Sequence, residues 1–143
     1  MEASHATGSI LLLTRLARAV YRRSTKELLG IHLKELATLA YLRDHEEASQ
    51  QALTQALMLD ANSCVLLLNE LETAGYAERR RDPDDRRRHI VALTTAGRAA
   101  LERAERAQES IEDEVLANLG HEERAALKAL LSRALGSPAQ PTS

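Results

Sequence analysis

The sequence predicts a mainly α-helical fold that carries one small β-hairpin. Apolar residues recur every three to four positions over most of the chain, and this spacing is typical of helices that bury one face. The pattern changes to alternation around residues 76–93, which favours two short strands. Hydrophobic residues fill 44% of the 143 positions although Phe and Trp are absent, so Leu, Ala, Ile and Val must form the core. A chain of this length fits one domain, or one domain with an arm.

Composition restricts the classes of protein to which the chain can belong. Cys64 is the single cysteine, which excludes an intrachain disulfide and a paired-cysteine metal or redox site. The five histidines lack the spacing of metal ligands, so we expect neither a metal nor another cofactor. The first residues lack the basic region of a signal peptide, and the longest strictly apolar run, 64–68, is far shorter than the ~20 residues of a membrane span. We therefore expect a soluble cytoplasmic protein with no membrane partner.

Four helices are expected in the first half of the chain because apolar residues recur there at helical spacing. Their expected ranges are 8–29, 33–43, 50–58 and 61–73. Gly30 follows the first helix as a stop, and a short connector over 45–48 precedes the third. Ser49 and Asp60 are residue types that cap helix N-termini, and Gly75 closes the fourth helix.

Two strands are expected next, over 76–81 and 89–93. Residues 82–85 between them read Asp-Pro-Asp-Asp, which is typical of a turn because proline fixes φ and aspartate bonds its own backbone. Together these segments predict a two-stranded hairpin with six arginines around its tip. The arginines are Arg79, Arg80, Arg81, Arg86, Arg87 and Arg88.

Two further helices after the hairpin complete an expected set of six. The first is capped by Thr94 or Thr95 and ends before Gly120, which interrupts the helical pattern. The last covers about 122–135. Residues 137–143 contain two prolines and are expected to form a flexible tail.

The net charge of −2 argues at first sight against nucleic acid as a partner, since a basic domain is the usual electrostatic signature of such proteins. The charge is unevenly distributed, however. Residues 44–78 contain seven acids and no Lys or Arg, whereas 79–88 contain six Arg and three Asp. A run of charge is usually only a solvated surface. Here the cationic run lies at the tip of the predicted hairpin.

Three motifs in and around the hairpin are long and evenly spaced: 71–79 (LETAGYAER), 82–87 (DPDDRR) and 91–97 (VALTTAG). With these motifs and its order of helices, the chain resembles the MarR family of bacterial transcriptional regulators over nearly its whole length. The resemblance implies a winged helix-turn-helix, in which the helix after the turn enters the DNA major groove and the hairpin reaches the neighbouring backbone or minor groove. It implies a ligand-responsive repressor that binds double-stranded DNA at a pseudo-palindromic operator.

The resemblance also implies a homodimer and a division of the chain into parts. The expected parts are an N-terminal dimerisation helix (1–32), the winged helix-turn-helix (33–94), C-terminal dimerisation helices (95–136) and the tail (137–143). The apolar stripes of the first and last helices agree with this, because one small winged domain cannot cover so much apolar surface. The residues expected at the dimer interface are Ile10, Leu13, Ile111, Val115, Leu119, Leu127, Leu130 and Leu131.

The expected DNA-reading surface is the face of the fourth helix that lies opposite Cys64, at 100° per residue. The residues on that face are Asn62, Leu66, Asn69 and Thr73. An asparagine suits adenine because its amide can pair with N6 and N7. Leu66 is unexpected there, and three interpretations stay open: a tolerated surface leucine, a contact with a thymine methyl group, or a dimer or ligand contact.

Affinity for DNA is expected to come mainly from the hairpin, because 44–78 contains no cation. Arg86 is expected to enter the minor groove, and Arg87 to be held by Asp85. Alternation puts about half of the other hairpin arginines on the phosphate side. Backbone N–H groups at the starts of the third and fourth helices can also hold phosphates. The expected DNA-contacting residues are Ser49, Gln50, Gln51, Asn62, Ser63, Leu66, Asn69, Arg79, Arg86, Arg87 and Arg88.

Many relatives in this family release DNA when a small anionic or phenolic compound binds between the dimer part and the DNA-binding lobe. The candidate ligand-binding residues are Arg15, Arg18, Tyr21, Arg22, His32, Tyr41 and His45. The three arginines share one helix face and could clamp a carboxylate. The alternative is that they form surface or inter-subunit ion pairs. Cys64 is interpreted as a buried structural thiol rather than a redox sensor.

Two other functional classes fit the sequence less well. An enzyme would need a glycine-rich phosphate loop, an activated nucleophile or an isolated carboxylate pair, and the sequence shows none of these. The three hairpin aspartates lie among six arginines and are expected to be paired and ionised. A winged helix that binds a protein instead of DNA remains the alternative, supported by the acidic stretch over 44–78.

Overall fold

The computed structural model describes residues 7–136, and the tail expected over 137–143 lies outside this range. The helices are α1 (Ser9–Arg23), α2 (Lys26–Leu29), α3 (Leu33–His45), α4 (Gln50–Ala56), α5 (Ala61–Thr73), α6 (Thr95–Val115) and α7 (His121–Ala134). The strands are β1 (Glu47–Ser49), β2 (Ala77–Arg81) and β3 (His89–Leu93). The prediction of a mainly helical fold with a small hairpin is confirmed. Within residues 7–136, no helix combines the length and apolarity that crossing a membrane requires.

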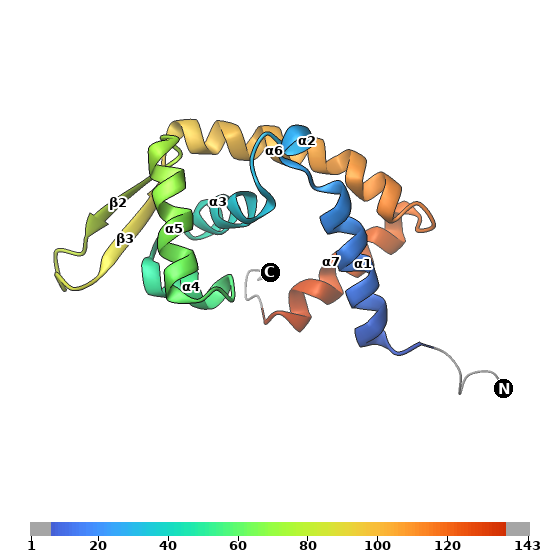
Figure 1. The fold of residues 1–143 in the computed structure, drawn as a ribbon. Helices are drawn as coiled ribbons and strands as arrows, with labels where there is room; N and C mark the ends of the chain where they lie inside the picture. The colour runs from blue at the N-terminus through green and yellow to red at the C-terminus, as the bar shows by residue number, and fades with distance from the viewer. Residues whose placement is uncertain (1–6, 137–143) are drawn as a thin grey trace.

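The molecule has two ends that α6 connects (Figure 1). At one end α3, α4, α5 and the sheet form a lobe from which the β2–β3 hairpin projects. At the other end α1 and α7 lie beside the second half of α6. The expected winged arrangement of helices and hairpin is therefore present at one end of the molecule only.

The prediction of one continuous helix over 8–29 is wrong. The helix α1 ends at Arg23, and the Ser24 hydroxyl donates to the carbonyl oxygen of Val20 at 2.6 Å. The Thr25 hydroxyl then accepts from the backbone N–H of Leu28 at 3.2 Å and caps the short helix α2. Side-chain bonds of Ser and Thr thus compete with the helical ladder at this point. The described residues contain seven helices for this reason, rather than six.

The expected connector over 45–48 is also wrong, because part of it forms the strand β1. This strand pairs antiparallel with β3, in the register Glu47 with Ala92 and Ser49 with Ile90. Residues 7–136 therefore contain a three-stranded sheet in the order β1-β3-β2 rather than an isolated hairpin. A strand of three residues is too short to show alternation in the sequence.

The lobe has its own hydrophobic core, and the N-terminal half of α6 closes it. The most completely buried large side chains include Leu39, Leu42, Leu53, Leu68, Leu71, Val91 and Leu101. The expected inward stripe of the fourth helix, which contains Cys64, is buried as predicted. Cys64 itself is 1% exposed and packs among these leucines.

A close approach joins the hairpin to α6. Of the two threonines considered as caps, Thr94 is the one that accepts from the backbone N–H of Gly97, at 2.9 Å. The Thr94 hydroxyl also donates to the carbonyl oxygen of Gly75 at 2.7 Å. A Cβ at Gly97 would lie 2.0 Å from the carbonyl oxygen of Tyr76. This contact explains why the motif over 91–97 needs a glycine at its end.

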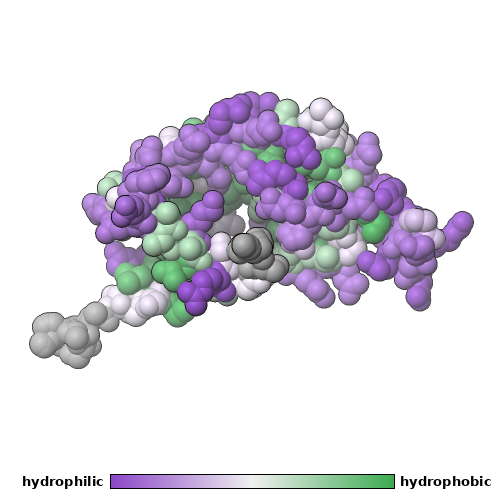
Figure 2. All heavy atoms as spheres, turned by 180° about the vertical axis from the view of Figure 1, so that it is seen from behind, coloured by the Kyte–Doolittle hydropathy of each residue, from purple (hydrophilic) through white to green (hydrophobic). Residues whose placement is uncertain are grey.

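The helices α1 and α7 contain no buried residue. Exposed apolar side chains expected at the dimer interface include Ile10 at 72% and Leu130 at 57%. Hydrophobic residues accordingly gather on the surface of α1 near the start of the described chain (Figure 2). Ile111 differs from this group, because it is 4% exposed and belongs to the chain's own core. The helix α6 ends at Val115, earlier than expected, and a turn follows it.

Candidate nucleic-acid interface

The helix α5 presents a narrow outward face to solvent. Asn62, Leu66 and Asn69 are exposed on it, whereas the opposite face of the helix is buried in the lobe. Leu66 is 55% exposed, so within the monomer it does not pack into the core. The outward face offers two amides and one apolar side chain. A surface of this kind can read base edges but supplies no cation.

The start of α5 differs from the expected phosphate site. One Asp60 carboxylate oxygen accepts from the backbone N–H of Ser63 at 2.7 Å, and the other from the Ser63 hydroxyl at 3.0 Å. These two bonds lower the pKa of Asp60. A group expected to donate to phosphate is therefore already bonded, and beside it stands a carboxylate that repels anions. The expectation for Ser63 has no support in this geometry.

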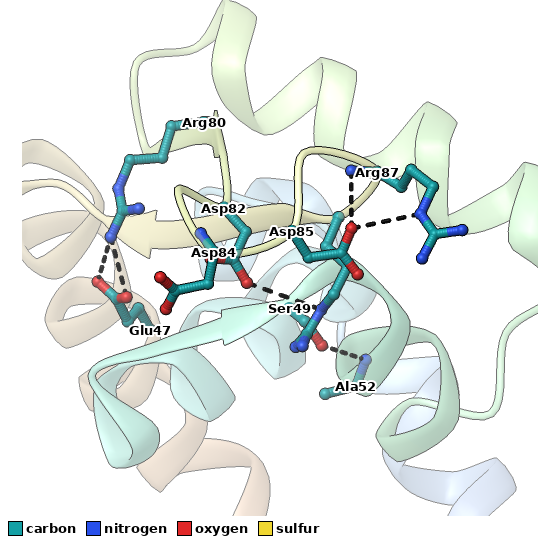
Figure 3. Close-up of polar contacts among 9 residues, drawn as sticks. Glu47, Ser49, Ala52, Arg80, Asp82, Asp84, Asp85 and Arg87 are labelled. Carbon is teal, nitrogen blue, oxygen red and sulfur yellow. Dashed lines mark hydrogen bonds and ion pairs between the residues drawn. The ribbon is translucent and has the colours of Figure 1, made fainter.

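The start of α4 faces the hairpin across a hollow. The Ser49 hydroxyl accepts from the backbone N–H of Ala52 at 3.0 Å and so caps the helix (Figure 3). The hollow has a volume of about 440 Å³, and polar side chains form most of its wall. The residues that line it are Ser49, Gln50, Gln51, Thr54, Gln55, Ala61, Arg87, Arg88 and His89. The structure thus brings together five of the expected DNA-contacting residues.

Arg79 lies at the base of the hairpin and is bound inside the lobe. Its side chain is 19% exposed. One guanidinium nitrogen, Nη2, donates to Asn69 Oδ1 at 2.6 Å and to Glu72 Oε1 at 2.9 Å. The other, Nη1, donates to Gln50 Oε1 at 3.3 Å, and the backbone N–H donates to Glu72 Oε2 at 3.2 Å. These bonds join α4, α5 and β2, and they occupy the group expected to contact phosphate.

Two further arginines of the sheet are engaged within the chain. Arg80 donates to both carboxylate oxygens of Glu47, each at 3.0 Å, across the face of the sheet (Figure 3). Arg81 donates to the backbone carbonyl oxygen of Arg86 at 2.6 Å. Glu47 and Glu72 had no role in the sequence interpretation. Periodicity gives no signal for them, because their partners lie on other elements that only the fold brings near.

The tip of the hairpin presents the remaining arginines. Asp85 Oδ1 accepts from the backbone N–H of Arg87 at 3.1 Å and from its Nε at 3.4 Å, while the Arg87 side chain stays 92% exposed. This contact agrees with the expectation, taken from the family resemblance, that Asp85 holds Arg87. Arg88 approaches Asp82 at 3.9 Å and is half exposed. Arg86 is exposed, and its guanidinium forms no hydrogen bond or ion pair within residues 7–136.

The expected ligand-binding residues divide between several places. Tyr21 lines a hollow of about 460 Å³ between α1, α3 and the turn after α4, together with Leu33, Lys34, Ala37, Leu57, Met58 and Leu59. Tyr21 and His32 both line a smaller hollow of about 380 Å³ beside it. Arg15, Arg18 and Arg22 line neither of them, and Tyr41 stacks on His45 with ring centroids 3.9 Å apart. Lys34 was missed, because only the fold places α1 over this face of α3.

Comparison with known proteins identifies relatives that are helix-turn-helix transcriptional regulators. The model of the MarR family matches residues 29–88. An uncharacterised helix-turn-helix regulator of Bacillus subtilis, YdgJ, is 36% identical over 104 residues, which are 73% of this chain and 63% of that protein. The regulator BilQ of Clostridium symbiosum is 32% identical over 73% of this chain and 72% of its own length. A putative regulatory protein for the hcr operon of Thauera aromatica is 36% identical over 95 residues, and the chain spans 57% of that protein's length and 63% of the length of YdgJ.

A solved structure extends the similarity to nearly the whole fold. A mutant MarR of Escherichia coli, crystallised in complex with operator DNA, superposes with a TM-score of 0.72 at 27% identity. The match covers 87% of this chain and 91% of that one. The lobe, the hairpin and the helices at the other end therefore follow one known architecture. The chain belongs to the MarR family of winged helix-turn-helix transcriptional regulators.

Proposed function

We propose that this protein is a dimeric transcriptional repressor that binds a pseudo-palindromic operator. The helix α5 enters the major groove with its outward face, and the hairpin tip reaches the neighbouring backbone and minor groove. The observation that carries the proposal is the pair of exposed arginines, Arg86 and Arg87, at the tip of a hairpin beside an outward polar helix face. The similarity to an Escherichia coli MarR that was crystallised with operator DNA supports it.

The six hairpin arginines differ in how far their guanidinium groups are engaged. The guanidinium groups of Arg79, Arg80 and Arg81 form hydrogen bonds within the chain. At the tip, Arg86 is exposed, Arg87 is 92% exposed although it contacts Asp85, and Arg88 is half exposed, as Arg80 is. The tip therefore supplies most of the positive charge that meets phosphate, and α5 supplies base contacts. This division predicts modest nonspecific affinity, because each phosphate contact contributes to the salt-dependent part of binding.

A second copy of the chain completes the surface that α1 and α7 leave uncovered. A hollow of about 970 Å³ runs between the end of α6 and α7, and leucines form part of its wall. The exposed side chains of Ile10 and Leu130 add apolar surface at the same end of the molecule. A large apolar patch on an otherwise polar protein is typical of a subunit interface. Twofold symmetry of the dimer then accounts for an operator with two related half-sites.

The test is operator binding by the Arg86→Ala variant across a salt series. The DNA is the intergenic region upstream of the gene, and fluorescence anisotropy gives the affinity. Two contacts are lost per dimer, so the slope of log affinity against log salt should fall by about 2. Arg106→Ala, on the exposed side of α6, removes the same charge far from the hairpin and serves as the control. Unchanged operator affinity of Arg86→Ala would refute the role of the hairpin tip.

The protein-binding alternative predicts a different result with the unaltered chain. A folded dimer, verified by light scattering, would then give no gel shift at low salt. A shift that persists against an excess of unrelated DNA supports the repressor.

The hollow lined by Tyr21 and Lys34 is the proposed site for a small anionic or phenolic effector. Its walls are mostly apolar, with one ammonium group to pair with an anion, and it lies between α1 and the DNA-binding lobe. A ligand there would change the position of α1 relative to the DNA-binding lobe and so reduce the affinity for DNA. Benzoate should release labelled operator from the unaltered protein but not from Lys34→Ala. Equal release from both would exclude this hollow.

A further inference from the structure

Two side-chain amides on the DNA-facing side of the lobe share one guanidinium group. Arg79 Nη2 donates to Asn69 Oδ1 at 2.6 Å, and Arg79 Nη1 donates to Gln50 Oε1 at 3.3 Å. A guanidinium group has only donors. Each amide must therefore turn its oxygen toward Arg79, and its NH₂ group is the part that is left to bond elsewhere.

Arg79 is firmly held in this arrangement before any DNA arrives. Both oxygens of Glu72 bond it, one to Nη2 at 2.9 Å and the other to its backbone N–H at 3.2 Å. Charge-assisted bonds of this kind are roughly twice as strong as bonds between neutral groups. An amide that turned its oxygen outward would break a short bond to a largely buried cation. The orientation of Asn69 is therefore fixed by the protein.

The two amides occupy different places relative to DNA. Asn69 lies on the outward face of α5, within about 60° of Asn62 and Leu66 at 100° per residue. Gln50 is the first residue of α4 and lines the hollow shared with Arg87 and Arg88. Asn69 is thus placed for the base edges, and Gln50 for the DNA backbone.

We propose that Arg79 is a positioning residue that turns Asn69 into a donor, so that Asn69 selects guanine at one position in each half-site. The inference rests on the proposed function, because it requires α5 in the major groove. Guanine presents two acceptors there, N7 and O6, whereas adenine presents one acceptor and one donor. The pairing of asparagine with adenine needs the amide oxygen as well as the NH₂ group to face the base, and the bond to Arg79 turns the oxygen of Asn69 toward the protein. Gln50 donates in the same way to a phosphate oxygen.

Asn62 provides the contrast within the same helix. Its side chain is exposed and has no hydrogen-bond partner among the described residues, so both ends of its amide are available. Asn62 therefore keeps the ability to pair with adenine that the sequence interpretation gave to both asparagines. Asn62 and Asn69 lie on the same helix face but are expected to read different bases, because only Asn69 is hydrogen-bonded to Arg79.

The experiment measures affinity for every single-base variant of the operator. The position that Asn69 reads is defined as the one at which Asn69→Ala loses its preference. The unaltered protein should prefer guanine there by about tenfold over adenine. Asn69→Asp keeps an acceptor for Arg79 but replaces the N–H donors with a carboxylate oxygen and adds a negative charge. It should therefore bind all DNA more weakly, lose this preference and keep those at other positions. Asn62→Ala should change a different position.

Arg79→Met tests the positioning role directly. With the guanidinium absent, the amide of Asn69 can rotate, and the same position should accept adenine as well as guanine. Uniformly weaker binding with an unchanged preference would show a structural role only and overturn the proposal. An unaltered preference in Asn69→Asp would overturn it as well, even if Arg79→Met does not fold. If the unaltered dimer binds no sequence specifically, the proposed function itself fails, which distinguishes the two failures.

Discussion

The lobe and the terminal helices of this protein differ in how they bury their apolar residues. In the lobe, Leu39, Leu42 and Leu53 are completely buried by neighbours from the same chain. In α1 and α7 no residue is buried, and α1 begins with four exposed apolar side chains over 10–13. The lobe therefore buries its apolar residues within one chain, whereas the terminal helices leave exposed an apolar surface that a second copy could cover.

The helix α6 belongs to both regions. Ala100, Leu101 and Ala104 of its first half are buried against the lobe. Arg43 of α3 donates to Glu105 at 2.6 Å, and this bond raises the pKa of Arg43. The second half of α6 contacts the terminal helices partly through exposed ion pairs, such as Arg23 with Glu114 at 3.1 Å. Because exposed ion pairs contribute little to stability, apolar contacts must supply most of the stability of the terminal region.

The largest effect is expected from breaking the terminal region alone. Leu130→Asp places a charge on the exposed apolar surface of α7 in both copies of the dimer. Losing this burial twice should cost about 3–5 kcal/mol of dimer stability. Sedimentation should show a monomer, while hydrogen exchange in α3 and α5 stays slow because the lobe keeps its own core.

Leu66→Asp is the matched control for this prediction. Leu66 is 55% exposed and Leu130 is 57% exposed, but Leu66 lies on the lobe. The Leu66 variant should remain a dimer. A monomeric Leu66 variant would instead support the third interpretation of that residue, a contact between subunits.

Gly97→Ala should disrupt the lobe at the close contact between the hairpin and the start of α6. The added Cβ would lie 2.0 Å from a backbone oxygen of Tyr76, and neither atom belongs to a flexible side chain. Overpacking against backbone should destabilise the protein by about 3 kcal/mol. Urea unfolding measures the loss. Gly8→Ala, where a Cβ would meet nothing within 4 Å, should lower the midpoint much less, by no more than the loss of a glycine N-cap of α1. An equal midpoint in both variants would contradict the prediction.

Met58→Gly should stabilise the lobe and leave the terminal region as it is. Met58 has a φ of 56° and is 87% exposed, so it adopts a left-handed conformation without packing in return. Removing its side chain should add about 0.5–1 kcal/mol to the free energy of unfolding. Met58→Ala keeps the Cβ and should give no such gain. Thermal unfolding of the two variants distinguishes them.

Local signals explain which parts of the fold the sequence could predict. The bounds of α5 were predicted correctly because Asp60 at its start and Gly75 after its end act within a few residues. The contact between Asp85 and Arg87 could also be predicted, because the two residues lie only two positions apart. The break after Arg23 and the strand β1 were missed, since neither a proline nor a glycine marks the break and β1 exists only through pairing with β3.

At the candidate site, too, the sequence did not predict contacts between residues that are distant in the chain. Arg79 was expected to contact phosphate because it stands in a cationic run. The structure bonds it to Gln50, Asn69 and Glu72, which lie on two other elements. Charge in a sequence therefore predicts where cations gather, but the fold decides which of them are already neutralised. Of the four arginines expected to contact DNA, Arg86, Arg87 and Arg88 lie exposed at the hairpin tip, and their contact with DNA stays a prediction.

The smallest expected effect concerns Asp60, the N-cap of α5, and it should make the stability of the lobe depend on pH in the acid range. Hydrogen bonds from Ser63 lower the pKa of Asp60 below its ordinary value of 3.8. A lowered pKa in the native state means that Asp60 stabilises the lobe above that ordinary value and loses this contribution as the pH falls through the native one. Asp60→Asn removes the charge and should therefore depend less on pH in this range.

The measurement is hydrogen exchange of the amides at the start of α5, compared with those of α7, as the pH is lowered. The start of α7 has a carboxylate of its own, because Glu123 accepts from the backbone N–H of Gly120 at 2.8 Å. Asp60→Asn should therefore show a smaller change with pH at α5 and the same pH dependence as the unaltered protein at α7. An identical pH dependence of the two proteins at α5 would mean that the cap contributes nothing, and that packing alone distinguishes the lobe from the terminal helices.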